Sequence, residues 1–165
     1  MENLPKIELK LTKLEMFLEI MGYLLLVALW GFVIYTYSSL PNQIPIHFNG
    51  SGKVDDYHTK RSIFMLPVIG TFLFVMLTYK AASPENETYK VNITEQNRES
   101  QYRNTMNSFR MIKIIVATLF LLLSYKTSEV ARAQSSELGV SFLILCAAIV
   151  FLPLAYFTYK SYTLK

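Results

Sequence analysis

Charged residues are scarce in this sequence, and cysteine is almost absent. Asp, Glu, Lys and Arg together make up 17% of the 165 residues, whereas hydrophobic residues make up 52%. A soluble domain carries about 25% charged residues, so the composition argues against a soluble fold. The single cysteine, Cys146, has no partner for an internal disulfide, and we expect it to serve packing. The low content of charged residues and the high content of hydrophobic residues indicate a protein that lies in a membrane.

Motifs of hydrolytic catalysis are also missing. The sequence contains no His-Glu-x-x-His and no Gly-x-Ser-x-Gly. An enzyme would need a nucleophile with a base, paired carboxylates or a metal cage in a site that water can reach. We therefore do not predict an enzyme, although one loop of the chain keeps metal-assisted hydrolysis open.

Apolar runs separated by polar segments predict four membrane-spanning helices. About 20 helical residues are needed to cross a hydrocarbon core of roughly 30 Å. The third run is the weakest, and we expect Arg110, Lys113 and Lys126 at its ends to extend towards the headgroups. The predicted fold class is an all-α integral membrane protein, a four-transmembrane-helix bundle with a short extracytoplasmic hairpin-like loop. One domain, 1–165, holds spans at about 16–37, 62–79, 109–127 and 138–159, an outer loop at 38–61 and a cytoplasmic connector at 80–108.

The distribution of lysine and arginine predicts the orientation. Eleven of the 16 basic residues lie on the side of the termini and the connector, and the other five lie on the opposite side. Because basic residues concentrate on the cytoplasmic side of short loops, we expect a multi-pass protein of the cell membrane with both termini cytoplasmic. The net charge of +4 reflects this bias, so nucleic acid is not a predicted partner.

The polar segments on the cytoplasmic side have local patterns of their own. Ile7, Leu11, Leu14 and Leu18 recur at helical spacing, which predicts a short amphipathic helix on the membrane surface, with a strand as the alternative. In the connector, residues 89–93 alternate like a brief strand. Thr94 then offers an N-cap for a helix that starts near Glu95 and continues into the third span.

Ionisable residues near the inner boundary admit two interpretations each. Arg98, Arg103 and Arg110 either anchor the protein to the inner leaflet or form a face that docks a cytoplasmic partner. Glu19 and Lys113 either pair or extend separately to the headgroups. Because no ionisable residue is predicted near mid-bilayer, proton-coupled transport is disfavoured.

The outer loop is the most specific part of the sequence. Pro41 and Pro45 keep the chain extended, and Ile44, Ile46 and Phe48 alternate so that one face could be buried. The run from Asn49 to Gly52 is a strong turn signal, after which residues 53–57 could return as a second strand. The pattern predicts a small hairpin that caps the outer end of the bundle.

Both histidines of the chain lie in this loop. His47 could approach Asp55 across the turn, and a set of His47, Asp55 and His58 could bind zinc or a similar divalent ion. The spacing matches no established ligand motif, and local hydrogen bonding by His47 is the alternative. No other cofactor is expected. The predicted ligand-binding residues of the loop are His47, Asn49, Gly52, Asp55 and Lys60.

The loop resembles a known family. The residues that carry the likeness are Leu40-Pro41, Ile44-Pro45, His47-Phe48-Asn49, Gly52, Asp55 and Lys60. They resemble the domain of unknown function 1648 family, a small bacterial membrane domain also found at the N-terminus of SdpI-type toxin-immunity proteins. Residues 91–97, followed by 101–103 and 110–113, look like the family's connector into its next span. The family has glycines around an aromatic after the Asp, whereas here Asp55 is followed by Asp56-Tyr57-His58.

The resemblance implies a function. We expect a non-enzymatic multi-pass membrane protein that senses, or protects against, an extracytoplasmic peptide or toxin through its outer loop, with lipid and such a peptide or protein as partners. The alternatives are a metal-binding or metal-dependent hydrolytic membrane protein and a small transport-associated subunit. The C-terminal part of an SdpI-type protein is expected to be absent after four spans, so immunity and signalling do not transfer directly.

Overall fold

Four long helices dominate the structure, a computed structural model that describes residues 6–133 and 137–164. They are α1 (Lys13–Tyr37), α2 (Met65–Ala82), α3 (Arg98–Ala131) and α4 (Val140–Thr163). Each is long and apolar enough to cross a membrane, as judged by length and composition. The prediction of four such helices is confirmed, although their bounds differ from the predicted spans by several residues.

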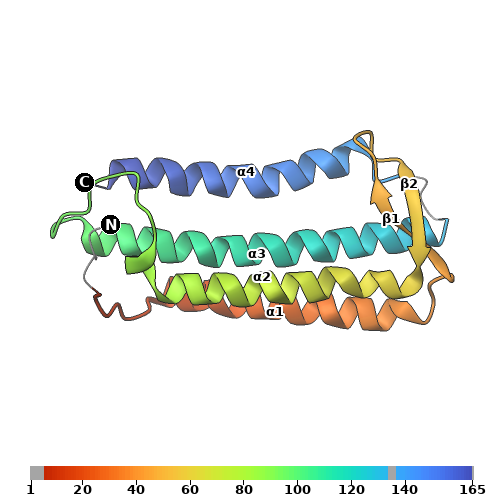
Figure 1. Cartoon of the computed structure of the whole chain (residues 1–165), viewed down its shortest axis with the longest axis horizontal. Coiled ribbons are helices and arrows are strands. Elements are labelled where there is room, and N and C mark those ends of the chain that lie inside the picture. The colour runs from red at the N-terminus through yellow and green to blue at the C-terminus, as the bar shows by residue number, and fades with distance from the viewer. Residues whose placement is uncertain (1–5, 134–136, 165) are drawn as a thin grey trace.

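A hairpin of two antiparallel strands joins the first two helices. Strands β1 (Gln43–Phe48) and β2 (Val54–Thr59) are followed by the 3-10 turn η1 (Lys60–Phe64), which leads into α2. The predicted hairpin-like loop is thus a small sheet in an otherwise helical protein. Figure 1 shows the hairpin at one end of the bundle, here called the hairpin end. The two chain termini lie at the opposite end, here called the terminal end.

Helix α3 is the centre of the bundle. It packs against α1, α2, α4 and β1, whereas the main packing of α4 is on α3 (Figure 1). With 34 residues, α3 is about 51 Å long, more than a hydrocarbon core of roughly 30 Å requires. Its first turns are polar and therefore extend past the apolar part of the bundle.

The best-packed apolar core lies at the hairpin end. Leu29 and Val33 of α1 meet Leu40, Ile44 of β1 and Ile63 of η1, and all five are at most 4% exposed. In contrast, large apolar side chains on the outer faces of the helices are exposed, among them Val27, Val75 and Leu152. The hairpin is therefore built into the core of the bundle.

The predicted amphipathic helix before the first span is wrong. Residues 6–12 form neither a helix nor a strand, and α1 begins at Lys13. The reason is a capping box, in which the Thr12 hydroxyl accepts from the Glu15 N–H and the Glu15 carboxylate accepts from the Thr12 N–H. These bonds satisfy the first N–H groups of the helix and fix its start there.

The connector also differs from its prediction. Residues 89–93 form no strand, and the 3-10 turn η2 (Pro84–Asn86) comes before them. Thr94 and Asn97 exchange side-chain to backbone hydrogen bonds, so residues 94–97 form a closed turn and α3 begins at Arg98. The predicted continuity of this helix with the third span is confirmed.

Candidate functional site

The turn of the hairpin is held by one asparagine. The Asn49 Oδ1 atom accepts hydrogen bonds from the Ser51 N–H, the Ser51 hydroxyl and the Lys53 N–H, at 2.7–3.1 Å. The Asn49 N–H also donates to the Lys53 carbonyl oxygen at 2.9 Å. Asn49 is thus a structural residue of the turn.

The strands are paired irregularly. The register places Pro45 opposite Tyr57 and His47 opposite Asp56, so that Ile46 and Asp55 have no residue directly across from them. Such irregularities bend a strand and redirect its side chains. Ile44 is 1% exposed and Ile46 is 44% exposed, yet both line one apolar groove together with Phe48, in keeping with the alternation of these residues in the sequence.

His47 and Asp55 form the contact predicted from the sequence. The His47 Nδ1 atom lies 2.5 Å from the Asp55 Oδ1 atom, and their side chains are 66% and 41% exposed. An exposed pair of this kind contributes little to stability, at most about 1 kcal/mol. The two side chains are held in one geometry on the surface, where a ligand can reach them.

Gly52 and Lys60 connect the hairpin to the rest of the bundle. The Gly52 carbonyl oxygen accepts from the Leu138 N–H at 2.9 Å, and Gly52 has a φ of 81°. The Lys60 ammonium donates to the Leu40 carbonyl oxygen at 3.4 Å and lies 5.0 Å from the centre of the Tyr37 ring. Gly52 and Lys60 therefore support the hairpin. Among the predicted binding residues, only His47 and Asp55 bring their side chains together on the surface.

The three proposed metal ligands do not come together. The His58 Nδ1 atom lies 2.9 Å from the Ser62 Oγ atom, away from the pair of His47 and Asp55. Within residues 6–133 and 137–164, no group of three His, Cys, Asp or Glu side chains is placed to hold a metal ion. His58 sits opposite Ile44 in the sheet, which removes it from the turn where His47 meets Asp55.

A second polar cluster lies inside the bundle towards the terminal end. The Glu19 carboxylate accepts from the Lys113 ammonium at 2.6 Å and from Arg110 Nε at 3.1 Å. Lys113 also donates to the Thr78 hydroxyl at 3.2 Å, and its ammonium lies 4.9 Å from the centre of the Phe74 ring. Lys113 and Arg110 are 1% and 3% exposed. Both cations turn inward, so the expectation that they extend to the headgroups is wrong.

A neighbouring pair continues the cluster at the start of α1. Arg103 lies 3.2 Å from Glu15, whose side chain is 3% exposed, and Asn107 donates to the same carboxylate at 3.3 Å. Consequently Arg103 and Arg110 are engaged with α1. The predicted docking of a cytoplasmic partner on Arg98, Arg103 and Arg110 stays a prediction, but these arginines do not form one exposed face.

Sequence reasoning missed most partners of the buried charges. Thr78 and Phe74 are ordinary residues of an apolar span, and only the packing of α2 against α3 brings them to Lys113. The capping role of Glu15 could have been predicted, because a Thr followed three residues later by a Glu is the pattern of a capping box.

Fold and site together define a class: a small helical protein with four candidate membrane helices, a surface hairpin and a buried charge cluster. Residues 24–71 match the model of a family described as Domain of unknown function (DUF1648). The match runs from α1 through the hairpin into α2 and confirms the resemblance over these residues. It does not reach the connector at 91–113. Neither the curated proteins nor the solved structures contain a match.

Proposed function

We propose that this protein is a non-enzymatic multi-pass membrane protein whose hairpin recognises an extracytoplasmic peptide. The observation that carries the proposal is the outer edge of β2. One side of β2 pairs with β1. Along its other side, no strand lies within the part of the chain that the structure describes. Lys53, the residue before β2, forms an isolated bridge with Glu137. Such an edge offers backbone donors and acceptors to an extended peptide.

The side chains around this edge support the same function. Tyr57 is 56% exposed, and five of the six residues of β2 are exposed. Tyr57, two residues after Asp55 in β2, and the paired side chains of His47 and Asp55 give a surface that can contact both apolar and polar groups of a peptide. Because the hairpin is rooted in the core at Ile44 and Ile63, the surface is preorganised for binding.

The orientation is part of the proposal. By sequence, eleven of the 16 basic residues fall in the two terminal segments and in residues 80–113, which favours a cytoplasmic terminal end and an outward-facing hairpin. A Ser51→Cys variant in a Cys146→Ser background tests it with a membrane-impermeant thiol reagent. Labelling from outside intact cells is expected. Labelling only after the cells are opened would contradict the orientation.

A protection assay tests the function. Cells that express the chain and cells that lack it are exposed to peptides secreted by cultures of the native host, and the concentration that halts growth is measured. We expect expression to raise this concentration by about tenfold or more. Loss of one strong binding contact in the hairpin should reverse this increase. His47→Ala, Asp55→Ala and Tyr57→Ala should each abolish the protection.

Arg61→Ala is the matched control, because Arg61 is exposed at the same end but lies in η1, outside the strands. It should protect as the wild type does. Equal amounts of each variant in the membrane fraction must be confirmed by immunoblot. If the three hairpin variants protect as well as the wild type, the hairpin is not the recognition site.

A further inference from the structure

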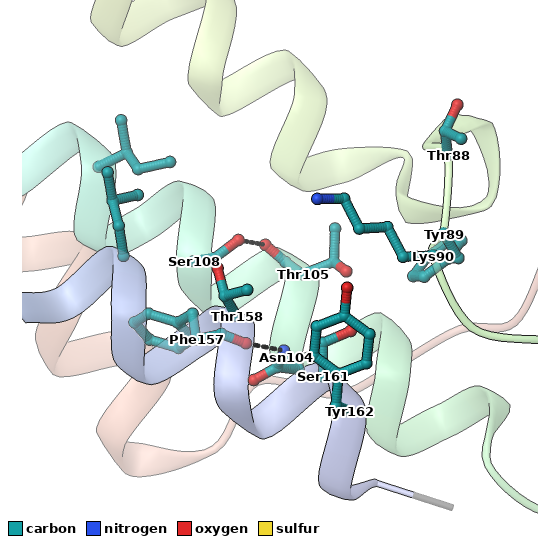
Figure 2. A pocket seen from close by; sticks show the side chains of 12 residues that line it. Thr88, Tyr89, Lys90, Asn104, Thr105, Ser108, Phe157, Thr158, Ser161 and Tyr162 are labelled. Atoms are coloured by element: carbon teal, nitrogen blue, oxygen red, sulfur yellow. Dashed lines mark hydrogen bonds between the residues drawn. The ribbon is translucent and has the colours of Figure 1, made fainter. Parts of the chain in front are cut away.

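A cavity of about 210 Å³ lies at the terminal end, away from the hairpin. It is bounded by α3, by the last turns of α4 and by the loop at residues 88–90 (Figure 2). Its lining consists of Thr88, Tyr89, Lys90, Asn104, Thr105, Ser108, Ile112, Leu154, Phe157, Thr158, Ser161 and Tyr162. None of these described residues is acidic. The cavity therefore combines one ammonium group with several hydroxyl groups.

Polar and apolar lining residues are separated along the helix axes. Tyr162 and Leu154 are eight residues apart on α4, which corresponds to about 12 Å along the helix. Leu154 and Ile112 thus lie deeper in the apolar part of the bundle, while Tyr162 and Lys90 lie at its polar end. Figure 2 shows Lys90 reaching across the cavity from the loop, with the Tyr162 hydroxyl directed to the same space from α4. A polar mouth above an apolar floor matches a phospholipid.

One buried acceptor in the lining has no donor. Asn104 is 5% exposed, and its Nδ2 atom donates to the Phe157 carbonyl oxygen at 3.1 Å. Its Oδ1 atom is buried without a hydrogen-bond partner among the described residues. Because buried polar atoms are nearly always hydrogen-bonded, this oxygen indicates a ligand that brings a hydrogen-bond donor.

The walls of the cavity are fixed in place. Gln101 Nε2 donates to the carbonyl oxygens of Ser161 and Leu164, both at 2.8 Å, and so ties the end of α4 to α3. The Tyr89 hydroxyl donates to the Pro84 carbonyl oxygen at 2.8 Å. The Tyr89 hydroxyl is neutral near pH 7 and does not repel an anion, and burial raises its pKa further, to about 12. The site therefore exists before a ligand enters.

We propose that this cavity binds the headgroup of an anionic phospholipid that carries a hydroxyl group, with phosphatidylglycerol as the representative. The Lys90 ammonium and the Tyr162 hydroxyl bind the phosphate, as basic pockets between membrane helices do. The headgroup hydroxyl donates to Asn104 Oδ1, and the acyl chains leave along Ile112 and Leu154. Free phosphate makes the same contact with the Lys90 ammonium, but it has no acyl chains to lie against Ile112 and Leu154.

Binding of a fluorescent phosphatidylglycerol to the purified full-length chain in neutral detergent tests this site. We expect one lipid per chain, displaced by unlabelled phosphatidylglycerol but poorly by phosphatidylcholine, whose quaternary ammonium has no donor for Asn104. Inorganic phosphate at millimolar concentration should not displace it. Lys90→Gln should weaken binding about fivefold, the effect of one basic residue at a membrane surface.

Two further variants make the result decisive. Lys160→Gln removes the same charge from the same end but lies outside the lining, near Tyr156, and should leave binding unchanged. Ser108→Leu fills the cavity without changing charge and should abolish binding, while the unfolding temperature reports an intact fold.

Three results would each overturn the proposal. Equal losses for Lys90→Gln and Lys160→Gln would show general surface attraction. Displacement by inorganic phosphate alone would show a site for small anions. Unchanged binding by Ser108→Leu would place the lipid elsewhere.

Discussion

Lys113 and Glu19 are 94 residues apart in the sequence, yet the Lys113 ammonium donates to the Glu19 carboxylate at 2.6 Å. The contact joins α3 to α1, and Thr78 of α2 accepts from the same ammonium. Three helices thus meet at one buried cation. Because an isolated charge in an apolar surrounding is very costly, the pairing constrains how α1 and α2 sit against α3.

Removal of the Glu19 carboxylate is the strongest test of this cluster. Glu19→Gln leaves Arg110 and Lys113, both nearly fully buried, without a carboxylate partner between them. We expect a loss of about 3–5 kcal/mol in the free energy of unfolding, as for other broken buried ion pairs. Chemical unfolding in detergent micelles, followed by circular dichroism, measures it.

Two comparisons accompany that variant. Lys80→Met breaks the partly exposed pair with Glu87, whose side chain is 21% exposed against 45% for Lys80, and should cost about 1 kcal/mol or less. The double variant Glu19→Gln/Lys113→Met should be more stable than Glu19→Gln alone, because one unpaired cation is gone. If the double variant is instead the less stable of the two, the unpaired buried cation is not the cause of the loss.

Gly52 is required by its backbone conformation. Its φ of 81° lies in a region that costs an L-residue roughly 1–2 kcal/mol, and an added Cβ would lie 3.5 Å from Leu138. Gly52→Ala should therefore lower the free energy of unfolding by about that amount. Gly50→Ala is the control, since its Cβ would meet nothing within 4 Å. Equal thermal stability of the two variants would contradict the assignment.

Gly70 permits the close approach of α2 to its neighbours. A Cβ there would lie 3.0 Å from Phe120 Cδ2 and 3.4 Å from Leu29 Cδ2. Gly70→Ala should destabilise the bundle by about 1–3 kcal/mol through overpacking. Gly31→Ala, with open space around the added Cβ, should be neutral or slightly stabilising because alanine favours helix. Thermal unfolding of both variants in the same detergent is the measurement, and a Gly70→Ala variant as stable as Gly31→Ala would rule out close packing at α2.

Tyr89 should make the protein sensitive to alkali. Burial raises its pKa from 10.0 to about 12, so the folded protein keeps the proton that the unfolded chain loses. The stability that depends on the neutral hydroxyl is fully present below about pH 10 and is lost as the pH rises through about 12. Tyr89→Phe should remove this part of the alkaline loss, as measured by unfolding midpoints at pH 9 to 12. An identical pH profile for both proteins would refute it.

Local patterns in the sequence predicted the elements well. Run length predicted four apolar helices, and prolines followed by Asn49-Gly50-Ser51-Gly52 predicted the hairpin with His47 beside Asp55. These features depend on residues close together in the chain, where periodicity and turn chemistry act directly. The start of α1 was missed although its capping box is equally local, because the apolar spacing of the preceding residues also suits a helix.

Contacts between distant segments were decided by the tertiary structure. Apolar spacing left open whether Glu19 and Lys113 pair, and only the packing of three helices closes the cluster. The register of the strands places His58 opposite Ile44, away from His47, and leaves Ile46 and Asp55 without a residue directly across, and no pattern within either strand indicates this irregularity. The sequence by itself therefore determined the four apolar helices and the hairpin with its turn. Packing decided which charges are buried together and which surfaces remain open, because that depends on side chains that the chain brings together from far apart.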